Sequence, residues 1–105
     1  MRILFDQGTP VPLRNHLPNH AIATAYERAW AKLSNGDLLA AAENDGFELF
    51  ITTDQNLRYQ QNFTGRKIAI LVLPTTRWLE IQQHGSDGAA AVATMNPGEF
   101  REFKW

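Results

Sequence analysis

The chain contains no cysteine, which excludes disulfide bonds and thiolate chemistry and leaves histidines or carboxylates as the ligands of any zinc site. Its three histidines lack the tight spacing of metal ligands, because Pro18 would break a helix between His16 and His20. No apolar run approaches the roughly 20 residues that a membrane-spanning helix needs. The N-terminus enters a strand pattern without a signal-peptide pattern, so we expect a cytoplasmic protein with no membrane partner.

Excess charge is also lacking, since the formal net charge is −1 at pH 7. This excludes a whole-surface attraction to nucleic acid or to anionic membranes, although a local basic patch stays open. The 105 residues are 44% hydrophobic and 20% charged, as in a soluble globular protein. We therefore expect a single domain that spans residues 1–105.

Strand and helix patterns alternate along the whole chain. This alternation predicts an α/β fold, with a mostly parallel sheet of four to five strands and helices on both faces. The last strand pattern, "EFREFKW", alternates as an exposed edge strand does. Strands are expected at 2–5, 21–26, 48–53, 67–73 and 99–105, and helices at 10–17, 35–45, 55–62 and from Arg77 onward, with a break at Gly85 and Gly88.

Two apolar strand patterns run directly into an aspartate, "ILFDQG" at Asp6 and "FITTDQN" at Asp54. The natural strand order places the second strand outside the first, with the third and fourth strands on the other side. The order then reverses between strands one and three, and ligands bind at such a switch point, beyond the carboxyl ends of the strands. We therefore expect the two carboxylates to lie close together.

Each aspartate has an ordinary alternative role as the cap of the helix that follows it. A pair at a switch point instead favours a site for Mg²⁺ or Mn²⁺, which bind carboxylate oxygens and keep several waters. Asp37 is a candidate third ligand, or else a favourable charge in the first turn of its helix. Asn56 is a candidate neutral ligand, and Gln7 could hold a water.

The chain resembles small bacterial PIN-like proteins of the DUF5615 type, which are relatives of PIN-domain toxins. The resemblance rests on "MRILFDQGTPVPL", "NGDLLAAAENDGFELFITTDQNLRYQQN" and "GRKIAILVLPTTRW", and it covers almost the whole chain. It implies a Rossmannoid three-layer fold and a ribonuclease that depends on Mg²⁺ or Mn²⁺. It also implies the toxin of a toxin–antitoxin pair, with a small antitoxin as partner.

Carried over to this sequence, the resemblance implies that Asp6, Asp54 and Asp37 are the catalytic and metal-binding acids. Two positions depart from the family pattern, because Gln7 stands where relatives often have glutamate, and Asn56 is the only candidate ligand after Asp54. These departures predict a less charged site that binds metal more weakly.

Basic residues near the predicted site could contact RNA. Arg58, Arg14 and Arg66 are the candidates, and Arg58 and Arg66 are expected near the same end of the sheet as the aspartates. Arg58 could instead pair with Asp54, four residues before it. Tyr59 is better interpreted as a packing residue than as a base-stacking one. The "EFREFKW" edge could pair with a partner chain or with a second copy in a homo-oligomer.

Two other functions compete with the ribonuclease interpretation. A response-regulator receiver also has aspartates after strands one and three. It needs an acidic pair where this chain has Asp6-Gln7, and a lysine near the fifth strand, for which Lys104 comes too close to the chain end. A degenerate PIN-like module would bind RNA or a partner protein without catalysis. Metal-induced stabilisation separates a nuclease site from such a module.

Overall fold

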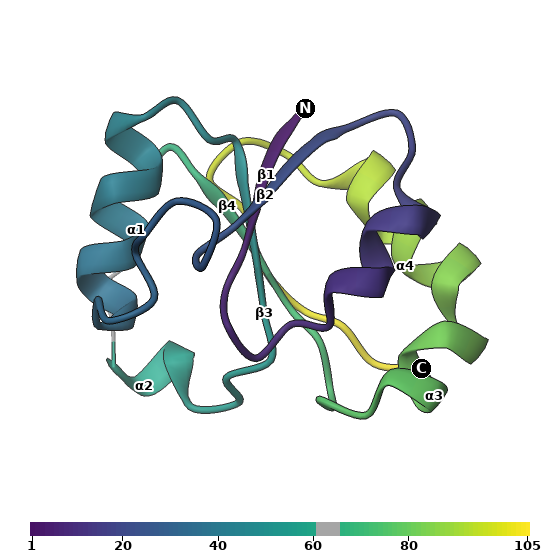
Figure 1. Cartoon of the computed structure of the whole chain (residues 1–105). Coiled ribbons are helices and arrows are strands. Elements are labelled where there is room, and N and C mark those ends of the chain that lie inside the picture. The colour runs from purple at the N-terminus through teal and green to yellow at the C-terminus, as the bar shows by residue number, and fades with distance from the viewer. Residues whose placement is uncertain (61–65) are drawn as a thin grey trace.

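A parallel β-sheet forms the centre of the molecule (Figure 1). The structure is a computed structural model, and it describes residues 1–60 and 66–105, except for the side chains of Arg58 and Gln60. The strands are β1 (Arg2–Phe5), β2 (Ala21–Thr24), β3 (Leu49–Thr52), β4 (Ala69–Val72) and β5 (Phe100–Glu102). The helices are the 3-10 helix η1 (Val11–His16), α1 (Asn35–Asn44), α2 (Leu57–Gln60), α3 (Trp78–Gln83) and α4 (Gly85–Thr94).

The five strands of this sheet lie in the order β2-β1-β3-β4-β5, and every neighbouring pair in the described chain is parallel. In register, Phe5 is opposite Thr24 of β2 and Ile51 of β3. The predicted α/β class, strand order and edge position of the last strand are therefore confirmed. The order reverses between β1 and β3, so the predicted switch point exists.

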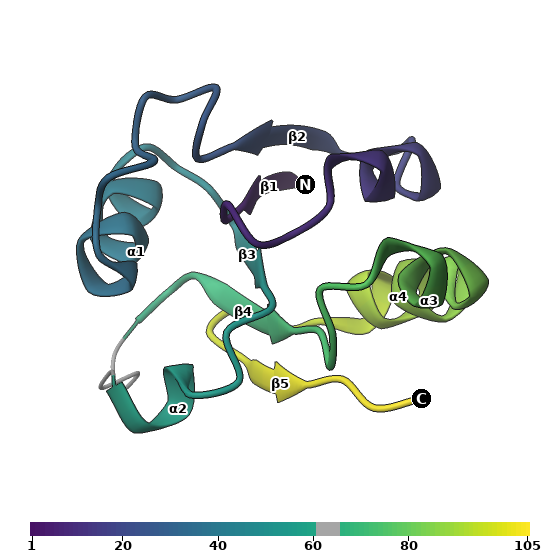
Figure 2. The ribbon, with the colours of Figure 1, turned by 60° about the horizontal axis from the view of Figure 1, so that its bottom comes forward.

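Helices cover both faces of the sheet (Figure 2): α1 and α2 lie on one side, and η1, α3 and α4 lie on the other. Because side chains alternate along a strand, each strand contributes to two cores. Ile3 and Phe5 of β1 face η1, α3 and α4, while Leu4 faces the α1 side. This two-sided burial explains why β3 and β4 are buried at every position and are apolar except at Thr52, the last residue of β3.

The helix α1 has the ends that its sequence predicts. Ser34 is the N-cap, and its Oγ accepts a hydrogen bond of 3.3 Å from the backbone N–H of Asp37. Leu38, Leu39 and Ala42 form its buried stripe. Gly46 follows the helix at φ +81°, a left-handed conformation that glycine adopts without a steric cost.

Several predicted boundaries were wrong by one or more residues. The strand predicted at 21–26 ends at Thr24, where the chain turns, and the segment from Pro10 forms a 3-10 helix. The helix predicted from Arg77 begins as α3 at Trp78, with Arg77 as its N-cap, and the N–H of Arg77 donates to Thr75 Oγ1. The predicted break is confirmed next to Gly85, since His84 separates α3 from α4, but Gly88 lies inside α4 and does not break it. Of the helix predicted at 55–62, the structure shows α2 over Leu57–Gln60, and the part of the prediction at 61–62 lies outside the described residues.

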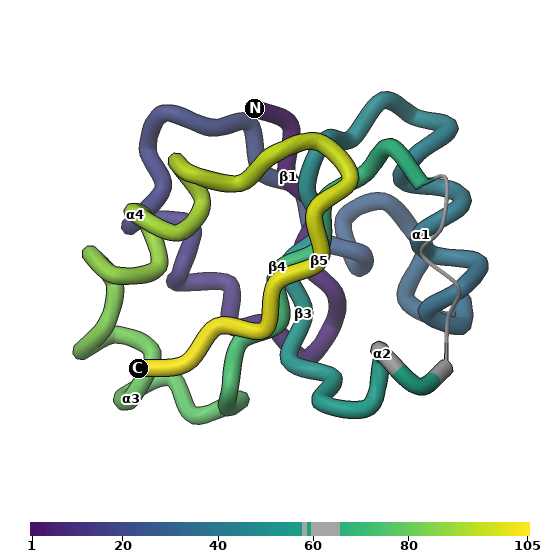
Figure 3. The backbone as a smooth tube through the Cα atoms, turned by 180° about the vertical axis from the view of Figure 1, so that it is seen from behind, coloured from purple at the N-terminus to yellow at the C-terminus, as the bar shows by residue number. Residues whose placement is uncertain are grey.

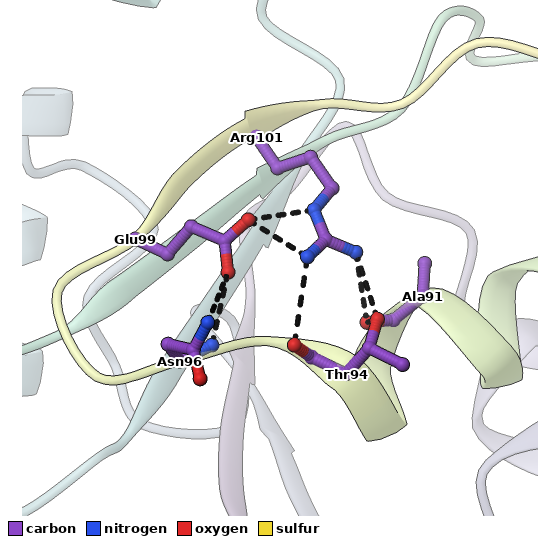
Figure 4. Close-up of polar contacts among 5 residues, drawn as sticks. All are labelled: Ala91, Thr94, Asn96, Glu99 and Arg101. Carbon is purple, nitrogen blue, oxygen red and sulfur yellow. Dashed lines mark hydrogen bonds and ion pairs between the residues drawn. The ribbon is translucent and has the colours of Figure 1, made fainter.

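The edge strand β5 is fastened to the end of α4 by Arg101 (Figure 4). Its Nε donates to Glu99 Oε2 at 2.7 Å, and its Nη1 donates to Thr94 Oγ1 at 2.9 Å and to the Ala91 carbonyl at 3.4 Å. The Ala91 carbonyl lies in the last turn of α4, at the negative end of the helix dipole. The backbone N–H of Asn96 and then Arg101 lower the pKa of Glu99. We call these contacts of Arg101 the tie. It combines an ion pair with Glu99 and hydrogen bonds to the C-terminal end of α4.

The segment after β5 crosses the molecule and ends beside α3 (Figure 3). The Trp105 indole stacks on the His84 ring, with centroids 4.5 Å apart, and its Nε1 donates to Glu80 Oε1 at 3.2 Å. In the described ranges 1–60 and 66–105, no helix is long and apolar enough to cross a membrane.

Candidate functional site

Asp6 and Asp54 lie at one edge of the sheet, because each follows the carboxyl end of a strand and the strands are parallel. Asp6 comes directly after β1, and its backbone N–H donates to the carbonyl of Ile51 in β3 at 3.1 Å. Asp54 comes two residues after β3. We call this side of the sheet the carboxyl edge.

The Asp6 carboxylate is buried, with 9% of its residue surface exposed. Its Oδ1 accepts hydrogen bonds from the backbone N–H of Thr9 at 3.0 Å and from Thr9 Oγ1 at 2.7 Å, and its Oδ2 accepts one from Thr52 Oγ1. A buried carboxylate is costly unless such donors replace its water. These bonds hold the side chain in one position and leave Oδ2 with capacity for a further partner.

Thr52 links the two aspartates. Its side chain is fully buried, and its hydroxyl donates to Asp6 while accepting the backbone N–H of Asp54 at 3.1 Å. A hydroxyl has one hydrogen and can also accept. Because the Thr52 hydroxyl accepts from Asp54, its single hydrogen is directed to Asp6. The strand end of β3 therefore positions both acids through one side chain.

Asp54 is half-buried and is held from two sides. Its Oδ1 accepts the backbone N–H of Asn56 at 3.0 Å, which is the local turn expected after a strand. Its Oδ2 accepts the side-chain amide of Asn35 at 2.7 Å. Asn35 is the first residue of α1, so the helix start reaches the carboxyl edge. The sequence analysis did not include Asn35 among the candidate site residues.

The loop after Asp6 lies tightly against the end of β3. A Cβ placed on Gly8 would come within 2.6 Å of Thr53 Oγ1, closer than such atoms approach in proteins. Glycine at this position therefore lets the two strand ends approach each other.

A small pocket of about 110 Å³ opens beside Asp6. This volume has room for several waters, as a hydrated cation would need. A larger hollow of about 430 Å³ lies at the opposite edge, around Met1 and Met95, away from both aspartates. The small pocket is lined by Asp6, Gln7, Gly8, Ala25, Trp30, Ala31, Leu33, Asn35 and Leu38.

The donor set of the carboxyl edge fits a hard divalent cation with two carboxylates, from Asp6 and Asp54. Mg²⁺ typically takes one or two carboxylates and keeps several waters, so this number suffices. Among the described residues, however, no three acids, histidines or cysteines are grouped to hold a metal. Asp37, predicted as the third acid, is exposed and does not join the pair in such a group.

Two of the three predicted RNA contacts are engaged elsewhere. Arg14 Nη2 pairs with Glu27 Oε1 at 2.5 Å, and this hydrogen bond is the main cause that lowers the pKa of Glu27. Arg66 Nη1 lies 3.6 Å from Glu43 Oε1. The prediction that Arg66 lies near the aspartates was wrong, because it precedes β4 and so stands at the opposite edge of a parallel sheet. The side chain of Arg58 lies outside the described residues.

The carboxyl edge must therefore be interpreted from its own geometry and from the motifs of the sequence. Comparisons with models of protein families, with curated proteins and with solved structures found no match for this chain.

Proposed function

We propose that this protein is a ribonuclease that depends on Mg²⁺ or Mn²⁺, and that Asp6 and Asp54 hold the cation. The observation that carries the proposal is the Asp6–Thr52–Asp54 linkage, in which one hydroxyl joins the Asp6 carboxylate to the backbone of Asp54 at the switch point of a parallel sheet. The likeness to PIN-like nucleases in the sequence supports the same assignment. A bound divalent cation supplies a more acidic water and offsets charge on a phosphodiester.

The chain's own side chains have distinct roles in this proposal. Thr9 and Thr52 donate hydrogen bonds to the Asp6 carboxylate and hold it in one orientation, in which Oδ2 can also contact the cation. Asn35 orients Asp54 from the start of α1. The pocket beside Asp6 has room for waters, and in this proposal the scissile phosphate approaches its mouth.

A second function, a non-catalytic module that binds RNA or a partner protein, is favoured by one observation. The α1 residue that contacts Asp54 is an amide, Asn35, whereas the acid of the same helical turn, Asp37, is exposed to solvent. The site then has two carboxylates, whereas PIN nucleases usually have three or four acids. Under either function, a cognate antitoxin or a second copy would be the natural partner of the outer edge of β5.

Metal binding is tested by thermal unfolding with Mn²⁺, Mg²⁺ or chelator. A ligand at 100 times its dissociation constant stabilises a protein by about 2.7 kcal/mol, which raises the melting temperature measurably. We expect Mn²⁺ to stabilise the parent protein and the control variant Asp37→Asn, and to leave the double variant Asp6→Asn/Asp54→Asn unchanged. An equal response of the parent and the double variant would place any metal elsewhere.

Catalysis is tested separately, by cleavage of single-stranded RNA with Mn²⁺. The proposed ribonuclease loses activity with chelator and in Asp6→Asn, so activity that persists in both indicates a contaminant. Stabilisation by Mn²⁺ without cleavage of varied RNAs would support the non-catalytic module. Light scattering of the purified protein, alone and after co-expression with the candidate antitoxin, tests whether the partner is a second copy or the antitoxin.

A further inference from the structure

Most arginines of the described chain are engaged in ion pairs with carboxylates. These pairs hold loops and helix ends in place, so their guanidinium groups are not available to bind phosphate without breaking a structural contact. The paired arginines are Arg2 and Arg28, which share Asp45, together with Arg14, Arg66 and Arg101.

Four other cationic side chains are exposed and have no ion pair within residues 1–60 and 66–105: Lys32, Lys67, Arg77 and Lys104. Their distribution over the sheet is uneven. Lys67 precedes β4 and stands at the amino edge, whereas the other three follow the carboxyl ends of β2, β4 and β5. The available positive charge therefore gathers on the side of the sheet where the aspartates lie.

The strand order arranges two of these cations around the carboxylates. Across the carboxyl edge, the segments after β2, β1, β3 and β4 carry Lys32, Asp6, Asp54 and Arg77 in turn. Lys104 follows β5, one strand further away. Figure 2 shows the loop between β2 and α1 on one side of the ends of β1 and β3, and the loop between β4 and α3 on the other.

Local contacts tie both loops to the site. Ala31 and Leu33, on either side of Lys32, line the pocket that contains Asp6. On the other side, Gln55 Nε2, next to Asp54, donates to the carbonyl of Leu73, in the segment that leads to Arg77. The two cations are thus attached to opposite sides of the same site.

We propose that Lys32 and Arg77 bind phosphates of a nucleic-acid strand that crosses the carboxyl edge between them, over Asp6 and Asp54. We call this route of the nucleic acid the strand path. Cleavage of the bound nucleic acid rests on the proposed function, but binding along this path needs no metal. Each contact replaces counterions on the phosphate backbone, so binding falls with rising salt. With a formal net charge of −1, the rest of the protein adds no general attraction, and these two contacts should dominate affinity.

The experiment measures fluorescence anisotropy of labelled single-stranded RNA and of the matching DNA, in chelator, over a series of salt concentrations. We expect Lys32→Gln and Arg77→Gln each to weaken binding roughly three- to tenfold, and to lower the salt dependence by about 0.7 per lost contact. The matched control is Lys67→Gln, which makes the same change in charge at the amino edge and should leave both quantities unchanged. Thermal unfolding confirms that each variant is folded.

The strand path is overturned if the double variant Lys32→Gln/Arg77→Gln binds as the parent does, if Lys67→Gln weakens binding equally, or if the parent binds neither strand. Binding of both RNA and DNA supports contacts to phosphate alone, and binding of RNA alone assigns the path to RNA. Because the assay contains no metal, it is independent of the proposed reaction. A protein without a response to Mn²⁺ can still bind a strand through Lys32 and Arg77, and a metal-binding protein can fail this test.

Discussion

At the scale of single residues, Asn35 sets the charge of the candidate site. Its amide donates to Asp54 Oδ2 at 2.7 Å, in a place where a carboxylate would be within reach of a shared cation. This hydrogen bond holds the Asp54 side chain toward the start of α1. The same contact leaves the site one negative charge short of a three-carboxylate centre.

We predict that Asn35→Asp destabilises the metal-free protein at neutral pH and increases its response to Mn²⁺. Two carboxylates at hydrogen-bond distance repel each other, at a cost of about 1–2 kcal/mol, and a divalent cation between them reverses that repulsion. Thermal unfolding with chelator and with Mn²⁺ measures both effects, and Asp37→Asn serves as the control. An unchanged response to Mn²⁺ would show that residue 35 does not face the metal.

Residue identity alone did not separate Asn35 from Asp37. Both belong to the first turn of α1, but successive residues of a helix point about 100° apart, so positions two apart face very different directions. The preference for an acidic ligand favoured Asp37, whereas the structure turns Asn35 inward. Asp6 and Asp54 were predictable because their strands end at one edge whatever the rotation of any helix.

At the scale of secondary-structure elements, β5 depends on side-chain ties as well as on its ladder. It is three residues long and lies at the edge, and Glu99 and Arg101 connect it to the end of α4. Glu99 Oε1 accepts the backbone N–H of Asn96 at 3.0 Å, which closes the turn before the strand. Ionised Glu99 therefore supports both the turn and the tie (Figure 4).

We predict that Glu99→Gln lowers the urea midpoint near neutral pH and that this difference disappears in acid. The pKa of Glu99 is lowered by the folded state, so its stabilising contribution is complete above the ordinary glutamate pKa and is lost as pH falls through the lowered value. Urea unfolding of both proteins from neutral pH to below about pH 4 measures the effect. A difference that stays constant over this range would contradict the role of the ionised carboxylate.

The elements were largely predictable, and their ends were not. The apolar runs at Arg2–Phe5 and Ala69–Val72 predicted buried strands, because parallel strands are covered on both faces. The prediction for Arg66 was wrong because it assumed that closeness to Asp54 in the sequence means closeness in space. The crossover between β3 and β4 returns the chain to the amino edge before β4 begins.

At the scale of the whole molecule, one sheet separates two apolar cores. Ile81 of α3 belongs to one core and Ile68, just before β4, belongs to the other. Strands that contribute alternate side chains to both cores couple them, so loss of one face exposes the other. Strand order and layer arrangement followed from the regular alternation of patterns, whereas the pairing of charges across loops depended on side-chain positions that no local pattern encodes.

We predict that Ile68→Val and Ile81→Val each destabilise the protein by about 0.5–1.5 kcal/mol, through the loss of one buried methylene. Because the sites lie on opposite faces, the double variant should show the sum to within about 0.5 kcal/mol, in one cooperative transition. Urea unfolding followed by far-ultraviolet circular dichroism and by tryptophan fluorescence tests this. Two separate transitions would show that the cores unfold independently.

The parallel arrangement also gives the molecule a direction. The described chain enters the sheet at Met1 on the amino edge, and after β5 it finishes at Trp105 beside α3, on the side of the aspartates (Figure 1). A support or carrier protein attached ahead of Met1 would leave Asp6 and Asp54 facing the solution. The same attachment after Trp105 would crowd them, so immobilised protein should be tethered by its first residue.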